Sequence, residues 1–231
     1  MYERDSYETA AGPLVVIPIH HATFVMEWNG ETIYCDPVGD AKRFADLAPP
    51  TLIVLTHHHG DHLDIEALRK LMGEDIALIA PQMVLEQLPP EIADRTTVLA
   101  NGEKTSWHGI GIEAIPMYNT TPERQKFHVK GAGNGYLFDF AGTIVYLASD
   151  TEPTAEMDRL GKVDIAFFPM NLPYTMTPEQ VVTCIEKTSP RYAYPFHYRF
   201  PFDQPAFEPA DLAKLMPRGA GTQIVERNWY Q

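Results

Sequence analysis

The stretch Thr56-His57-His58-His59-Gly60-Asp61-His62 decides the fold, and it follows directly on the apolar run Leu52-Ile53-Val54-Leu55. Histidine and aspartate side chains are ligands that zinc and similar divalent metals bind. Two histidines one residue apart, on the segment that leaves a strand, can chelate one ion, and Asp61 and His62 can turn toward a second. The chain has 9 His in 231 residues, so this spacing would arise by chance in roughly one such sequence in a thousand. The sequence therefore predicts a metal site rather than a solvated histidine-rich loop.

Bulk composition excludes several classes of function. A length of 231 residues suffices for a sizeable core, and we expect one domain over residues 1–231. A net charge of −13 argues against a nucleic-acid or anionic-membrane surface, because both need clustered Lys and Arg. Cys35 and Cys184 are far apart and form neither a disulfide framework nor a thiolate zinc motif. The N-terminus lacks the apolar segment of a signal peptide, and no apolar run approaches the roughly 18 residues of a membrane span, so we expect a cytoplasmic protein.

The order of strand-like and helix-like segments predicts the fold class. Asn29-Gly30 between two β-rich runs is a strong hairpin signal. Thr177-Pro178-Glu179-Gln180 is typical of a helix start, with a Thr cap and Pro at the first helical position. Strands paired with helices in two successive halves imply an α/β protein, a four-layer αβ/βα sandwich whose strand order stays open. We expect strands at 14–19, 23–28, 32–36, 51–56, 76–80, 111–116, 135–140, 143–148, 163–168, 192–196 and 223–225, and helices at 64–72, 82–88, 177–187 and 209–216.

Three further residues are candidate ligands because they lie at or near the ends of predicted strands. Asp150 follows the apolar run 144–147, where a carboxylate can bridge two ions or, alternatively, cap a helix near Glu156. His197 follows the strand at 192–196, and it is either a ligand or a half-buried strand histidine. His128 lies in a loop before the strand at 135–140. Each is ambiguous alone, but the histidines of the 57–62 loop need partners.

Taken together, these motifs resemble the metallo-β-lactamase superfamily. The resemblance rests on the His-x-His-x-Asp-His loop, on Ser149-Asp150-Thr151 and on Phe196-His197-Tyr198. Further segments, in the same order from about residue 13 to 200, are similar to a bacterial metal-dependent hydrolase branch related to ascorbate-6-phosphate lactonase and to N-acyl-phosphatidylethanolamine phospholipase D. These segments are His21-Ala22-Thr23-Phe24, Asp36-Pro37, Phe127-His128-Val129-Lys130-Gly131, Gly135-Tyr136, Tyr174-Thr175-Met176-Thr177-Pro178-Glu179 and Pro195-Phe196-His197-Tyr198.

The resemblance implies a ligand set for two divalent ions. His57 and His59 would bind the first ion, Asp61, His62 and His197 would bind the second, and Asp150 would bridge them. The superfamily's third histidine on the first ion should fall near residues 116–119, where this chain has Asn119, and His128 is the expected substitute. His21 and Asp36 would orient ligands or touch substrate, His58 would point away from the ions, and His108 would be exposed. Imidazole ligands favour zinc, and related lactonases use manganese.

The chemistry that follows is hydrolysis by a hydroxide generated on the ions, with Asp61 as the catalytic residue that accepts or relays a proton. The expected substrate is a small, anionic molecule with a lactone, ester, amide or phosphodiester bond. The loop at 119–131, with Arg124, Lys126 and Lys130 against Glu123, could neutralise its charge, although a solvated loop is an alternative.

Other functions compete with this one. RNA phosphodiesterase activity is disfavoured by the acidic charge, and flavodiiron-like redox chemistry by His59, where those proteins use Glu. An antibiotic-degrading β-lactamase is disfavoured by the missing secretion signal. A non-catalytic metal-binding protein of the same fold stays open because of Asn119.

Overall fold

The chain forms two seven-stranded sheets, each of which comes from one half of the sequence. The computed structural model describes residues 2–73, 75–200, 202, 207–217 and 219–230. The strand orders are β1 to β7 in the first sheet and β14 back to β8 in the second. In both, the first four strands of the half pair antiparallel and the rest pair parallel. The first sheet holds β1 Asp5–Thr9, β2 Gly12–His20, β3 Thr23–Trp28, β4 Glu31–Cys35, β5 Leu52–Val54, β6 Ala77–Ala80 and β7 Thr96–Val98, and the second holds β8 Lys104–Trp107, β9 Ile110–Pro116, β10 Asn134–Phe140, β11 Thr143–Leu147, β12 Ile165–Pro169, β13 Tyr192–Phe196 and β14 Gln223–Ile224.

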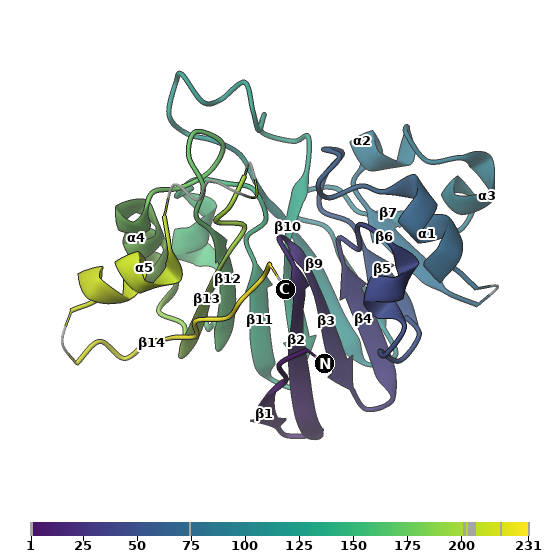
Figure 1. The fold of residues 1–231 in the computed structure, drawn as a ribbon, viewed down its shortest axis with the longest axis horizontal. Coiled ribbons are helices and arrows are strands. Elements are labelled where there is room, and N and C mark those ends of the chain that lie inside the picture. Colours follow the sequence, from purple (N-terminus) through teal and green to yellow (C-terminus); the bar gives the residue numbers. More distant parts are fainter. Residues whose placement is uncertain (1, 74, 201, 203–206, 218, 231) are drawn as a thin grey trace.

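Helices lie outside the two sheets, which confirms the predicted four-layer αβ/βα sandwich. Figure 1 shows α1 to α3 beside β5 to β7 on one side of the molecule, and α4 and α5 beside β12 and β13 on the other. In the described part of the chain, no helix has both the length and the apolar character needed to cross a bilayer. The helices are η1 Ala41–Phe44, α1 Ile65–Leu71, α2 Gln82–Leu85, α3 Pro90–Ala93, η2 Glu156–Arg159, α4 Pro178–Thr188 and α5 Pro209–Leu215.

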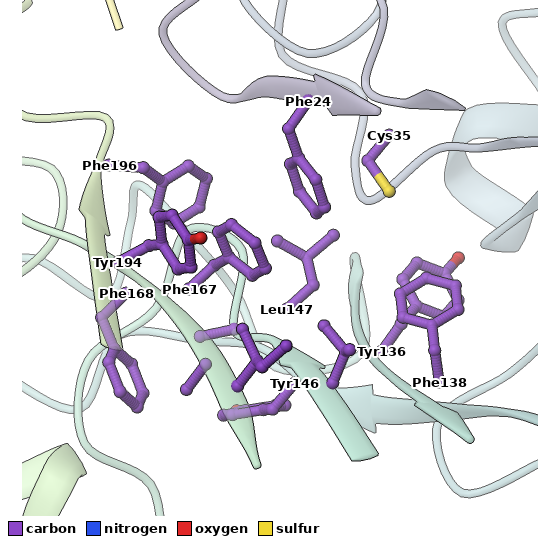
Figure 2. Close-up of a cluster of buried hydrophobic side chains, with 14 of the residues drawn as sticks. Phe24, Cys35, Tyr136, Phe138, Tyr146, Leu147, Phe167, Phe168, Tyr194 and Phe196 are labelled. Carbon is purple, nitrogen blue, oxygen red and sulfur yellow. The ribbon is translucent and has the colours of Figure 1, made fainter. Parts of the chain in front are cut away.

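Aromatic side chains from both sheets fill the space between them. Phe24 of β3 stacks on Phe167 of β12, with ring centroids 4.2 Å apart, and Phe167 also stacks on Tyr194 of β13 at 4.7 Å. All three side chains are fully buried, and Figure 2 shows them meeting where the sheets face each other. These contacts hold together the two halves of the chain.

The Phe167→Ala variant should therefore lose much of the stability of the fold. We expect the free energy of unfolding to fall by about 3–5 kcal/mol, because the change leaves a cavity and removes both ring stacks. Urea unfolding followed by circular dichroism measures this loss. Leu215→Ala is the control, since Leu215 is 43% exposed and its truncation should cost no more than about 0.5 kcal/mol. Equal midpoints for the two variants would contradict the assignment of Phe167 to the core.

Most predicted elements are present, and the differences have local reasons. The Asn29-Gly30 turn joins β3 to β4, and Thr177 caps α4 through a capping box with Pro178 at its start, as predicted. Three strands, β1, β7 and β8, were not predicted, because each alternates partly buried with exposed residues and carries little apolar signal. The helix expected at 82–88 is the shorter α2, and Pro90 begins a further helix, α3, that was not predicted. The proposed cap at Asp150 is wrong, since Ala155 precedes η2 and makes no side-chain cap.

Candidate metal centre

The structure brings the seven candidate ligands together at one edge of the molecule. The loop with His57, His59, Asp61 and His62 follows β5, Asp150 follows β11, His197 follows β13, and His128 comes from the connection between β9 and β10. Their ligand atoms fall into three overlapping groups, within each of which the atoms lie no more than 4.8 Å apart. The groups are His57, His59 and His128; His57, His62 and Asp150; and His21, Asp61, His62 and His197.

Asp150 lies at the centre of this cluster and is 2% exposed. One of its carboxylate oxygens lies 3.5 Å from His62 Nε2, and the other lies 3.3 Å from both His128 Nε2 and His197 Nε2. Among the described residues, these three Nε2 atoms and Asp150 Oδ1 have no hydrogen-bond partner. Buried polar atoms without partners are costly, so four that converge on one another fit a cation held between them.

Asp61 forms the more open side of the cluster. Its Oδ2 lies 3.1 Å from His21 Nε2 and 3.3 Å from His197 Nε2, and its side chain is 21% exposed. His21 in turn lies with Nδ1 3.0 Å from the Tyr230 hydroxyl, so Tyr230 and Asp61 bracket the His21 ring. His21 therefore orients Asp61, while Asp61 alone of the two reaches solvent.

Asp36, at the end of β4, holds the loop of residues 56–62 in place through Thr56 and His62. Its carboxylate accepts from the Thr56 backbone N–H at 2.8 Å, from the Thr56 hydroxyl at 2.6 Å, and from His62 Nδ1 at 2.8 Å. A proton on Nδ1 leaves the Nε2 lone pair of His62 directed at the cluster, which is how carboxylates behind metal-binding histidines act. Asp36 thus sets both the ring orientation and the tautomer of His62.

Asn119 plays the same part for His128. Asn119 Oδ1 lies 3.3 Å from His128 Nδ1, and its amide group donates to the carbonyls of Arg124 and Tyr174 at 3.0 and 2.7 Å. His128 Nε2 is thereby turned toward Asp150. The resemblance places a metal ligand near position 119. This chain has Asn119 there, and Asn119 orients His128, the ligand expected in its place.

The Asn119→Ala variant should weaken metal binding at the His57, His59 and His128 group. Loss of such a supporting contact costs about 10–100-fold in affinity, and we expect a change of this size for one of the bound ions. Isothermal titration calorimetry with Zn²⁺ on the chelator-treated protein measures it. Gln82→Ala, which removes an amide that contacts Glu86 on the surface of α2, is the control. An unchanged isotherm for Asn119→Ala would remove Asn119 from the site.

Glu152 anchors the loop that carries His128, and the sequence did not single it out. Its side chain is fully buried and accepts from the backbone N–H groups of Thr120 and Thr121, at 2.6 and 2.5 Å, and from both hydroxyls. It also forms an ion pair with Arg124. Because Glu152 follows Asp150 by two residues, these contacts tie the loop at 119–128 to the strand end that presents Asp150. A single charged residue adds nothing to the periodic pattern of a sequence. The role of Glu152 is therefore visible only from its burial in the folded structure.

Backbone strain gathers at the site. His21, Asp36, Ser149 and His197 have φ angles of 55°, 43°, 58° and 50°, in the left-handed region that L-residues rarely adopt. Such strain costs of order 1–3 kcal/mol per residue and persists where the surrounding structure imposes it. The four residues follow strands of both sheets, and their backbone conformation directs the chain toward the cluster. Ser149 is the clearest case, since its side chain is buried and its Oγ makes no hydrogen bond with any described residue.

Gly133 allows the segment after His128 to approach the loop of residues 56–62. A Cβ at Gly133 would lie 2.8 Å from His57 Cβ, 2.8 Å from Met117 Sδ and 3.0 Å from the Thr56 carbonyl. The neighbouring Asn134 backbone N–H donates to that carbonyl at 2.8 Å. A larger residue at 133 would therefore push on His57 itself.

The protonation states suit cation binding. Burial lowers the pKa of His57 well below its ordinary value and the pKa of His59 to about 4, so both imidazoles are neutral at pH 7. Burial opposes charge on His62 and Asp150, but the carboxylates of Asp150 and Asp61 raise the pKa of His62 well above its ordinary value. The imidazoles of His197 and His62 in turn hold the pKa of Asp150 well below its usual range. A bound cation would replace the proton on His62 Nε2, while the proton on Nδ1 stays directed at Asp36.

The remaining predicted features divide between site and scaffold. Of the three cations in the 119–131 loop, Arg124 pairs with Glu152 and Lys130 with Glu156, while Lys126 has no ion pair among the described residues. His58 falls outside all three ligand groups, and His108 is exposed and contacts Glu31, both as expected. Of the aromatic residues around His197, Tyr194, Phe196 and Tyr198 are buried, whereas Phe200 and Phe202 line cavities.

Two mixed sheets with outer helices, and a His and Asp cluster at their strand ends, define a protein of the metallo-β-lactamase fold. The family model described as the Beta-lactamase superfamily domain matches residues 31–198. The chain therefore belongs to this superfamily, as the resemblance indicated.

Similar proteins are known in sequence and in structure. A "UPF0173 metal-dependent hydrolase" of Geobacillus thermodenitrificans is 28% identical over 223 residues, which cover 88% of this chain and 93% of that protein. The crystal structure of a proposed metal-dependent hydrolase from Parabacteroides distasonis has 33% identity and a TM-score of 0.89, with both chains fully covered. CmlA, a diiron β-hydroxylase from Streptomyces venezuelae, is 19% identical with a TM-score of 0.64 over 80% of this chain and 44% of its own, and it shares the fold alone.

Proposed function

We propose that this chain is a metal-dependent hydrolase that holds two divalent ions and cleaves a lactone, ester, amide or phosphodiester bond in a small anionic molecule. The observation that carries the proposal is the set of buried, unpartnered Nε2 and carboxylate atoms around Asp150. His57, His59 and His128 would hold one ion, Asp61, His62 and His197 the other, and Asp150 both. We propose zinc as the metal, with manganese as the second choice, because histidine ligands suit zinc. Relatives named as metal-dependent hydrolases support the reaction class.

A cavity of about 380 Å³ opens onto the cluster and gives substrate access to it. Its walls include Asp61, Asp150 and His197 of the cluster and the aromatic rings of Phe127, Tyr174 and Phe200. When bound, divalent ions supply Lewis acidity and make a water molecule acidic enough to act as a nucleophile at neutral pH. The aromatic walls exclude bulk water and align the substrate.

Asp61 is the group of this chain that we propose to move the proton. Its Oδ2 lies 3.1 Å from His21 Nε2 and 3.3 Å from His197 Nε2, at the edge of the cluster. It is also partly exposed and lines the cavity, so it can accept a proton from the attacking water and release it to solvent or to the leaving group. His21 keeps this carboxylate in place.

Lys126 is the residue that we propose to neutralise the charge of the substrate near the scissile bond. It lines the cavity at the cluster, and it is exposed and unpaired with any carboxylate in the described ranges. We also propose that the chain works as one domain, because the core between the sheets is shared by both halves of the sequence.

Metal content and hydrolysis together test the proposed function. We expect plasma mass spectrometry to find about two ions per chain in the wild type and about one in His128→Ala. Hydrolysis of bis(p-nitrophenyl) phosphate and of a γ-lactone probe, followed in parallel, should fall with the lost ion.

His108→Ala is the matched control, because it removes an exposed histidine that contacts Glu31 far from the cluster. It should keep both ions and the activity. One ion or none in the metal-replete wild type would contradict the two-metal proposal, and two ions without hydrolysis of either probe class would favour a binding protein.

A further inference from the structure

Three adjoining cavities form one cleft that passes over the candidate metal centre. The central cavity shares His59, Lys126, Phe127 and His128 with a cavity of about 530 Å³ on one side. On the other side it shares Gly60, Asp61 and Phe200 with a cavity of about 470 Å³. The cluster therefore lies in the middle of the cleft rather than at a closed end, which leaves room for substrate on both sides of the reacting bond.

One end of the cleft, here called the apolar end, has Met83, Met117, Phe127 and Val129 in its lining, together with Lys130 and with Lys126 and histidines where it joins the central cavity. Met83 is 39% exposed and Val129 is 59% exposed, so both present apolar surface to solvent. Four large apolar residues in the described part of the chain are this exposed, and these two share a single cavity. Apolar side chains gathered in a hollow mark a place for an apolar group. Lys130 at this end is neutralised by Glu156.

The opposite end, here called the basic end, is lined by His20, Val38, Arg43 and Phe202. Arg43 has no ion pair and no side-chain hydrogen bond with any described residue, although it is only partly exposed. Its guanidinium lies over Gly39, where a Cβ would come within 3.2 Å of Arg43 Nε. His20 Nδ1 is buried and has no hydrogen-bond partner in the described part of the chain.

The other charged groups at the basic end already have partners. Asp61 accepts from His21, and Asp64 accepts from the backbone N–H groups of Gly39 and Ala67. The Arg43 guanidinium thus has no ionic partner among the described residues and lies beside the cluster, and its donor groups match a carboxylate or phosphate.

We infer that the substrate has two unlike arms, an apolar arm in the apolar end and an anionic group held by Arg43 in the basic end, with the scissile bond between them. This inference rests on the proposed function, and it narrows the substrate to an amphipathic molecule cleaved at an internal bond.

Two hydroxamates of similar length test the apolar arm and the anionic arm separately. A hydroxamate binds the metal ions, hexanoyl hydroxamate adds an apolar arm, and glutaric monohydroxamate adds a carboxylate. Dissociation constants are measured by calorimetry on the zinc-loaded protein. Arg43→Gln should weaken the glutaric probe about ten-fold and leave the hexanoyl probe unchanged, because it removes a charge-assisted bond. Met83→Gln should weaken the hexanoyl probe about five-fold and leave the glutaric probe unchanged, because it removes apolar contact area.

Each variant has a control of matched exposure or charge. Arg191→Gln removes the same charge at the opposite end of the strand that leads to His197, and Leu215→Gln alters an apolar residue on α5 that is 43% exposed. Neither should change either probe. Equal losses for both probes, or Arg43→Gln behaving like Arg191→Gln, would overturn the two-arm inference. Binding of neither hydroxamate to the wild type would instead count against the metal centre, so the two failures are distinguishable.

Discussion

Asp150→Asn should abolish hydrolysis while leaving the fold intact. We expect the rate on either probe class to fall about 10³-fold or more, because the carboxylate contacts His62, His128 and His197 and an amide cannot supply its charge. Metal content should fall from about two ions to one or fewer. The substitution keeps the shape of a buried side chain, so the circular dichroism spectrum of the apoprotein should match that of the wild type, while the lost charge pairing with His62 lowers its unfolding midpoint.

Rate, metal content and unfolding midpoint of Asp150→Asn are therefore measured on the same preparation. Asp158→Asn is the control, since Asp158 is exposed and pairs with Lys187 on the helical side of the second sheet. A variant at position 150 that keeps two ions and more than a tenth of the rate would show that Asp150 does not join the two ligand groups.

The second large effect is expected at Asp36, where stability and metal binding are coupled. Asp36→Ala leaves the Thr56 N–H, the Thr56 hydroxyl and His62 Nδ1 without their shared acceptor in a buried place. We expect the free energy of unfolding to fall by about 3–5 kcal/mol. The affinity for the ion near His62 should fall by a further 10–100-fold, roughly, because the ring is no longer oriented.

Chemical unfolding of Asp36→Ala in the presence of a chelator measures the loss of stability without metal. Zinc titration measures the loss of metal affinity. Asp40→Ala serves as the comparison, because among the described residues Asp40 accepts only from the Lys42 backbone N–H at the start of η1, and its loss should cost about 1 kcal/mol. If Asp36→Ala resembled Asp40→Ala in both measurements, Asp36 would be an ordinary strand-end residue.

The sequence could predict the fold because its strongest signals are local. The Asn-Gly hairpin, the capping box at Thr177 and the apolar run before His57 each depend on a few neighbouring residues. β1 and β8 have no such signal, since half of each faces solvent, and the strand order depends on pairing over long distances.

The sequence could predict which candidate ligands cluster, and His21 and Asp36 beside them, but not the other residues that support the cluster. The 57–62 loop is a dense motif, and His128 was proposed through resemblance. Asn119 looked like a gap in the ligand set, whereas the structure shows it beside His128 Nδ1. Glu152 and the left-handed backbone of Ser149 are properties of packing between distant segments, and the sequence around them gives no periodic or compositional sign of their roles.

The division of the candidate ligands between the two halves of the chain has a consequence for the lifetime of the protein. His57 to His62 follow a strand of the first sheet, and Asp150 and His197 follow strands of the second, so each bound ion would cross-link the halves. Binding to the folded state alone adds about 2.7 kcal/mol of stability at a free metal concentration 100 times Kd. A cell short of metal would then hold less of this protein as well as a less active form, because the loosened seam would expose the chain to proteases.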